Sequence, residues 1–210
     1  MLRDLLSGFR FSPVDPVKKG LPESTRPVKK HVDKSGAVQN AIRIGKRVFN
    51  RRHPDYPGLT VTNTILGGYF GSRLMANIRE DKGYTYGIGS AISSLKDAGY
   101  FFLATEVGAD VCQLALTEIE KEIGLLKTEL VGEEELDLVR NYMLGAMLGS
   151  LENAFSHADK FKNVYFSGLD YTYYSNYIKT VKTISAEHLK ELANRYLNIS
   201  DFTKVVVGKK

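Results

Sequence analysis

The sequence has a single cysteine, no tryptophan and no long apolar run. One cysteine, Cys112, cannot form a disulfide within the chain, which excludes a small scaffold held together by disulfides. No apolar stretch approaches the roughly 20 residues of a membrane-spanning helix. Residues 1–16 also lack the apolar core of a secretory signal peptide. We therefore expect a globular protein without a membrane segment, and a cytoplasmic location is favoured.

Positive charge is distributed unevenly along the 210 residues, whose net charge is +5. Residues 1–52 contain thirteen Lys and Arg against four Asp and Glu, whereas the remaining residues are net acidic. Four of the six prolines lie in residues 11–38, where neither helical nor strand periodicity is visible. Proline removes a backbone donor and restricts the residue before it, which favours an extended segment. We therefore assign residues 1–38 to a linker or tail from a preceding domain and residues 39–210 to a folded domain.

Hydrophobic periodicity in residues 39–210 predicts both strands and helices. Alternating apolar residues predict strands around residues 42–48, 84–92, 99–107 and 202–207, the middle two forming an antiparallel hairpin. Residues 53–58 are predicted to form a turn. Apolar residues at helical spacing predict helices within residues 59–81, across 110–130, after Gly132 and past His157, around 171–178, and after the N-cap Ser185. The expected fold class is α+β, a two-layer sandwich of helices on a largely antiparallel sheet.

The sequence contains no motif of a self-contained enzyme. The glycine-rich loops that bind nucleotides and the G-x-S-x-G nucleophile elbow are both absent. The four histidines are scattered, and the closest approach to H-x-x-E-H is at residues 184–188, where Ile184 occupies the place of the first histidine. A catalytic zinc site needs three converging protein ligands. We therefore expect this chain to bind no metal and no other cofactor by itself.

One segment, residues 65–90, has a distinctive pattern. Three glycines interrupt its helical periodicity and permit close backbone approach, namely Gly67, Gly68 and Gly71. Arg79 ends the helix that follows, and Tyr86 lies seven residues later in a predicted strand. Placed over one spot, a guanidinium and a phenol can hold a peptide carbonyl or an oxyanion. In the structural alternative, Arg79 caps the helix and pairs with Glu80 or Asp81 while Tyr86 packs.

This segment resembles the signature of the C-terminal, non-catalytic half of the pitrilysin-type zinc metallopeptidases, which include insulinase and the mitochondrial processing peptidase. The family pattern L-G-G-x-F-x-S-R-L is matched by LGGYFGSRL at residues 66–74. The pattern R-E-x-x-G-x-x-Y is matched by REDKGYTY at residues 79–86. The order of predicted elements from residue 39 to residue 208 also fits one family half, so the resemblance covers most of the chain.

The resemblance implies one half of a two-half zinc endopeptidase. In that family the N-terminal half carries H-x-x-E-H and the zinc, and the C-terminal half supplies an arginine and a tyrosine. Carried over to this sequence, Arg79 holds a substrate carbonyl and Tyr86 hydrogen-bonds the tetrahedral oxyanion. The implied substrate-contacting residues are Gly67, Gly68, Phe70, Gly71 and Ser72. Because H-x-x-E-H is absent here, no hydrolysis is expected from this chain alone.

The implied partners are an N-terminal zinc-bearing half or a separate catalytic subunit, together with a peptide or unfolded-protein substrate. We expect neither nucleic acid nor a membrane as a partner. One alternative is a non-proteolytic core subunit of a complex, because family relatives with the same fold also have that role. A weaker alternative is nucleic-acid binding through the basic residues 18–52, which would weaken steeply with salt. The sequence leaves open the peptide preference and whether the chain is a fragment or a subunit.

Overall fold

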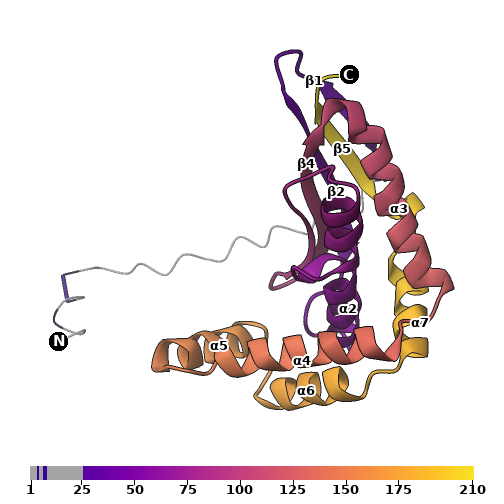
Figure 1. The fold of residues 1–210 in the computed structure, drawn as a ribbon. Coiled ribbons are helices and arrows are strands. Elements are labelled where there is room, and N and C mark those ends of the chain that lie inside the picture. Colours follow the sequence, from indigo (N-terminus) through magenta and orange to yellow (C-terminus); the bar gives the residue numbers. More distant parts are fainter. Residues whose placement is uncertain (1–3, 5–6, 9–25) are drawn as a thin grey trace.

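A five-stranded sheet forms the centre of the computed structural model, which describes residue 4, residues 7–8 and residues 26–210 (Figure 1). In spatial order the strands are β1 (Lys29–Asp33), β5 (Thr203–Gly208), β2 (Gln39–Val48), β4 (Gly99–Gly108) and β3 (Ile88–Ser94). Only β1 and β5 are parallel neighbours, and the other three pairs are antiparallel. The predicted α+β fold with a largely antiparallel sheet is therefore confirmed.

The helices form two groups (Figure 1). In the first group, α2 (Tyr56–Asn63) and α3 (Cys112–Thr128) pack against the sheet, and α7 (Ala186–Tyr196) packs against these two helices. Those lying across one end of the molecule are α4 (Glu133–Gly149), α5 (Ala154–Phe166) and α6 (Thr172–Thr183). Short helical turns complete the order: η1 (Thr64–Gly68), η2 (Met75–Asp81), η3 (Ala109–Val111) and η4 (Ile199–Asp201). Within the part of the chain that the structure describes, no helix combines the length and apolar character needed to cross a membrane.

The core lies between the sheet and the helices and follows from alternation along the central strands. Ile42 and Ile44 of β2 and Phe101 and Leu103 of β4 are buried on the inner face. Successive side chains of a strand point to opposite faces, so the intervening residues lie on the outer face. Arg43 and Glu106 form an ion pair there. The alternation that predicted these strands is thus the alternation that builds the core.

Strand β1 is absent from the sequence prediction, which assigned its residues to a linker. All five of its residues are exposed, so no apolar–polar alternation marks the strand. It is held instead by parallel backbone pairing with β5, from Lys29↔Lys204 to Asp33↔Gly208. The sheet therefore begins at Lys29 rather than at Gln39. The earlier linker assignment stays a prediction, and residues 9–25, with three of its four prolines, lie outside the described residues.

Three helix predictions need comment. Ser185 caps α7 as predicted, because its hydroxyl accepts a hydrogen bond from the His188 backbone N–H. The predicted turn at residues 53–58 is too long, since α2 already begins at Tyr56 with a proline in its first turn. A single helix from Gly132 past His157 was also wrong. The chain breaks after α4, and the Asn153 side chain accepts from the Ser156 backbone N–H to start α5 as a separate helix.

The inner face of β4 can be tested by truncation. Leu103 is fully buried, so we expect Leu103→Ala to lower the free energy of unfolding by about 2–5 kcal/mol, as cavity-forming changes do. The matched control is Leu138→Ala on α4, where the side chain is 55% exposed and the expected change is within about 0.5 kcal/mol. Urea denaturation followed by circular dichroism measures both. Equal midpoints for the two variants would contradict this packing.

Candidate functional site

The glycine-rich motif forms an exposed loop between two π-helical turns. The helix that starts at α2 continues through η1 and ends where Gly67 leaves helical geometry, at φ −160° and ψ 15°. Helical structure resumes before η2. Between them, Gly68, Phe70 and Gly71 are exposed, and the Phe70 side chain is 64% accessible. We call residues 68–71 the glycine loop.

Two of the predicted contact residues lie beneath this loop rather than on its surface. Gly67 is buried against the edge strand β3, and a Cβ atom there would lie 2.6 Å from the Ser90 hydroxyl oxygen and 2.9 Å from Leu74. Ser72 is also buried, and its backbone N–H donates to the Tyr69 carbonyl at 3.2 Å. Gly67 and Ser72 therefore shape the base of the glycine loop, whereas its exposed residues can meet another molecule.

Two contacts with α4 fix the loop on both sides of Phe70. Tyr69, before it, packs on Tyr142 with ring centroids 4.8 Å apart. Arg73, after it, donates two hydrogen bonds to the Glu135 carboxylate, at 2.8 and 2.7 Å. This pairing raises the pKa of Arg73, so its guanidinium stays charged. The loop tip is thus held between two anchors on one helix.

The sequence prediction missed these anchors. Arg73 was recognised only as a letter of the motif, and Glu135 only as one of three glutamates opening a helix. The two residues are 62 positions apart. Nothing in one sequence distinguishes the third glutamate of the run from its neighbours, so only the packing of α4 identifies the pair.

Arg79 lies in the last turn of η2 and meets the tip of the glycine loop. Its guanidinium carbon is 4.6 Å from the centroid of the Phe70 ring, which is the geometry of a cation–π contact. The predicted pairing with Glu80 is present only as a long contact of 3.9 Å between partly exposed groups. Ion pairs between exposed groups contribute little to the free energy of unfolding. The structure therefore places the Arg79 guanidinium in contact with the Phe70 ring and leaves it partly exposed to solvent.

Tyr86 lies in the loop before β3, not within a strand as predicted. Thr85 bends this loop, because its hydroxyl donates to the Glu106 carbonyl and accepts from the Gly87 backbone N–H. Pairing of β3 with β4 then begins only at Ile88. Tyr86 itself is 93% exposed, so the alternative in which it packs internally is wrong. No hydrogen bond or ring contact joins Tyr86 to Arg79 within the described residues.

The described residues do not offer a zinc site. No group of three or more His, Cys, Asp or Glu side chains converges in the parts of the chain that the structure covers. His53 stacks on Phe49 with centroids 3.8 Å apart, and His188 faces Glu191 at 3.2 Å on the surface of α7. The ligands that zinc requires are thus not provided by these segments, and no chemical step is assigned to a metal held here.

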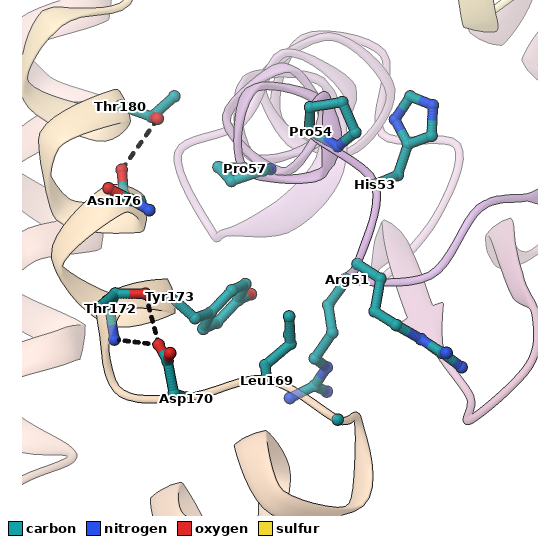
Figure 2. A pocket seen from close by; sticks show the side chains of 12 residues that line it. Arg51, His53, Pro54, Pro57, Leu169, Asp170, Thr172, Tyr173, Asn176 and Thr180 are labelled. Carbon is teal, nitrogen blue, oxygen red and sulfur yellow. Dashed lines mark hydrogen bonds between the residues drawn. The ribbon is translucent and has the colours of Figure 1, made fainter.

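A separate cavity of about 620 Å³ lies between the start of α2 and helix α6 (Figure 2). Its single carboxylate belongs to Asp170, which accepts hydrogen bonds from the Thr172 backbone N–H, at 2.8 Å, and from the Thr172 hydroxyl (Figure 2). This carboxylate therefore serves the first turn of α6. The cavity adjoins Pro54 and Pro57, at the opposite end of the α2–η1 helix from the glycine loop. It does not form part of the motif site.

Comparison with known proteins identifies the family. The sequence pattern of the family described as "Peptidase M16 inactive domain" matches residues 1–143. The chain belongs to this family. A crystal structure of a peptidase M16 inactive domain from Pseudomonas fluorescens superposes with a TM-score of 0.83 at 22% identity, covering 91% of this chain and 46% of that one. The predicted resemblance is therefore confirmed, and the chain is an inactive half of an M16 zinc protease-like protein.

Two bacterial relatives are described in different terms. "Uncharacterized zinc protease YmxG" of Bacillus subtilis is 28% identical over 190 residues, which are 90% of this chain and 46% of that protein. "Non-peptidase homolog YmxG" of Helicobacter pylori is 25% identical over 148 residues, which are 70% of this chain and 34% of that protein. The chain thus spans less than half the length of these relatives.

The close approach of Gly67 to β3 yields a testable prediction. We expect Gly67→Ala to lower the free energy of unfolding by about 1–3 kcal/mol, because the added methyl group overlaps Ser90 and Leu74. The control is Gly145→Ala in α4, where no atom lies within 4 Å of the added carbon. There the change should stabilise by up to about 1 kcal/mol, since alanine favours the helix. Thermal denaturation of both variants measures the difference, and unchanged stability of Gly67→Ala would contradict the packing.

Proposed function

We propose that the chain is the substrate-binding, non-zinc half of a zinc-dependent endopeptidase, with Arg79 and Tyr86 completing an active site formed with a zinc-bearing half. The observation that carries the proposal is the accessible Arg79 guanidinium stacked on Phe70 at the tip of an anchored glycine loop. Membership of the M16 inactive-domain family supports the same role. The substrate would be a peptide or an unfolded protein segment.

In this proposal each exposed group has a distinct task. Arg79 presents several N–H donors and no acceptor, which suits a peptide carbonyl oxygen. Its contact with the Phe70 ring limits the conformations of the guanidinium before substrate arrives. Gly68 and Gly71 carry no side chain that would hold a peptide backbone away from the loop. Together these residues bind and orient one segment of substrate.

Tyr86 would act by hydrogen bonding to charge that develops during hydrolysis. A phenol donor aimed at an oxyanion stabilises the transition state more than the ground state. Its 93% exposure means that the companion half must enclose it before this interaction gains strength in a water-poor site. Zinc in the companion half would supply the Lewis acidity for the reaction.

We also propose a cytoplasmic location for this protein.

A second candidate function is a non-proteolytic subunit with the same fold. The description of the Helicobacter relative as a non-peptidase homologue favours keeping this candidate. In that case the companion half would lack H-x-x-E-H as well. The glycine loop would then serve as a protein contact, and neither Arg79 nor Tyr86 would take part in hydrolysis.

Reconstitution with the zinc-bearing half tests the first proposal. We expect Tyr86→Phe to reduce kcat/KM by about 10²–10³-fold, the usual cost of one lost oxyanion donor. Arg79→Ala should reduce it at least tenfold, because a charged hydrogen bond to the substrate is lost. Cleavage of an internally quenched peptide library measures both. Matched controls are Tyr165→Phe and Arg52→Ala, which change exposed residues away from the glycine loop.

The outcomes separate the two candidates. Activity that survives both Arg79→Ala and Tyr86→Phe would contradict the site assignment. A reconstituted pair that cleaves no peptide, although both halves are folded and associated, would favour the non-proteolytic subunit. Loss of activity in the control variants as well would show that these substitutions act through folding, and would equally contradict the assignment.

A further inference from the structure

A small pocket lies beside the glycine loop, and the proposed function uses none of the residues that line it. It has a volume of about 270 Å³ and lies between η1, α4, α5 and α6. Two contacts join it to the loop. Tyr142, on its wall, packs against Tyr69, and Thr64, also on its wall, lies 3.3 Å from the position of a Cβ at Gly68. The pocket is therefore adjacent to the glycine loop.

The wall of the pocket is largely apolar and carries one cation. Met143 and Met147 of α4 line it, and Lys160 of α5 reaches it from the other side. The Lys160 ammonium contacts the Met147 sulfur at 3.5 Å and lies 5.4 Å from the Tyr174 ring centroid. Neither contact supplies negative charge. Among the described residues, no carboxylate forms an ion pair with Lys160, and no residue lining the pocket is acidic.

The surroundings make this unpaired charge costly. Burial lowers the pKa of Lys160, and the nearby Arg51 guanidinium lowers it further by like-charge repulsion. Burial also raises the pKa of Tyr177, on the pocket wall, to about 12, so its phenol stays neutral. A partly buried ammonium among methionines and tyrosines, with a second cation nearby, favours the arrival of an anion.

We propose that this pocket binds a carboxylate of the peptide that lies along the glycine loop, with Lys160 as its charge partner. The carboxylate belongs to an acidic side chain or to the C-terminus of the peptide, since the two share the same chemistry. The pocket volume suits one side chain and not a whole peptide. The placement of the peptide rests on the proposed function, whereas the carboxylate site itself can be tested without it.

The methionine methyl groups report on this pocket directly. The chain has four methionines, two of them in the pocket wall, and Met75 is buried in η2 as an internal reference. The probes are N-acetyl-glutamate N-methylamide, N-acetyl-glutamine with a free carboxyl group, and N-acetyl-glutamine N-methylamide as the neutral control. Titration of the ¹³C-methyl-labelled chain should shift the Met143 and Met147 signals with the first or second probe and leave Met75 unchanged. Whichever charged probe shifts them identifies the source of the carboxylate.

Variants at Lys160 decide the assignment. Lys160→Gln should weaken binding of the charged probe roughly tenfold, the loss expected for one charged hydrogen bond. Lys160→Arg keeps the charge and should bind within about threefold of the unmodified chain. The matched control is Lys162→Gln, an exposed lysine on the same helix that already pairs with Asp159. Shifts that are equal for the neutral probe, absent for both charged probes, or retained in Lys160→Gln would each overturn the proposal.

A second measurement separates this proposal from the proposed function. In the reconstituted pair, substrates differing by one Glu or Gln should be cleaved at different rates, and Lys160→Gln should abolish the difference without slowing the neutral substrate. Methyl shifts without any cleavage would sustain the carboxylate site and contradict the peptidase function. Cleavage without methyl shifts would support the peptidase function and contradict the carboxylate site.

Discussion

The organisation of the site depends on one steric constraint, the absence of a side chain where η1 crosses β3. Gly67 approaches Ser90 and Leu74 so closely that even a methyl group has no room. This contact ends the helix at the edge of the sheet and turns the chain outward into the glycine loop. The anchors on α4, the Phe70 tip and the stacked Arg79 all follow from that exit point. Close packing at a buried glycine thus influences which side chains are exposed further along the chain, at Phe70 and Arg79.

The site combines rigid and accessible parts in a way that suits binding. The Arg73–Glu135 pair and the Tyr69–Tyr142 contact lie where water is partly excluded, so they hold the loop base firmly. Phe70 and Tyr86, in contrast, are among the most exposed aromatic side chains of the described residues. Exposed aromatic groups on fixed supports lose little conformational entropy on binding. A surface of this kind agrees with the proposed role, in which a companion half encloses it.

Much of the fold could be predicted from the sequence, because alternation and helical spacing record which face of an element is buried. β2, β4 and α3 were found in this way. An element without a buried face shows no hydrophobic periodicity in the sequence. The residues of β1 are all exposed, and they were therefore assigned to a linker. The motif identified Arg79 and Tyr86 as candidate site residues, but a sequence motif does not give the positions of side chains in space. It could not show that Tyr86 precedes its strand, or that Glu135 anchors a residue 62 positions away.

The position of β5 has a consequence for how the molecule is made. This strand comprises residues 203–208, yet it lies inside the sheet, between β1 and β2. During synthesis, the facing edges of both neighbours therefore stay unpaired until residues 203–208 have left the ribosome. Open strand edges recruit other strands and promote aggregation. Removal of residues 203–208 would therefore delete an internal strand and leave the edges of β1 and β2 exposed.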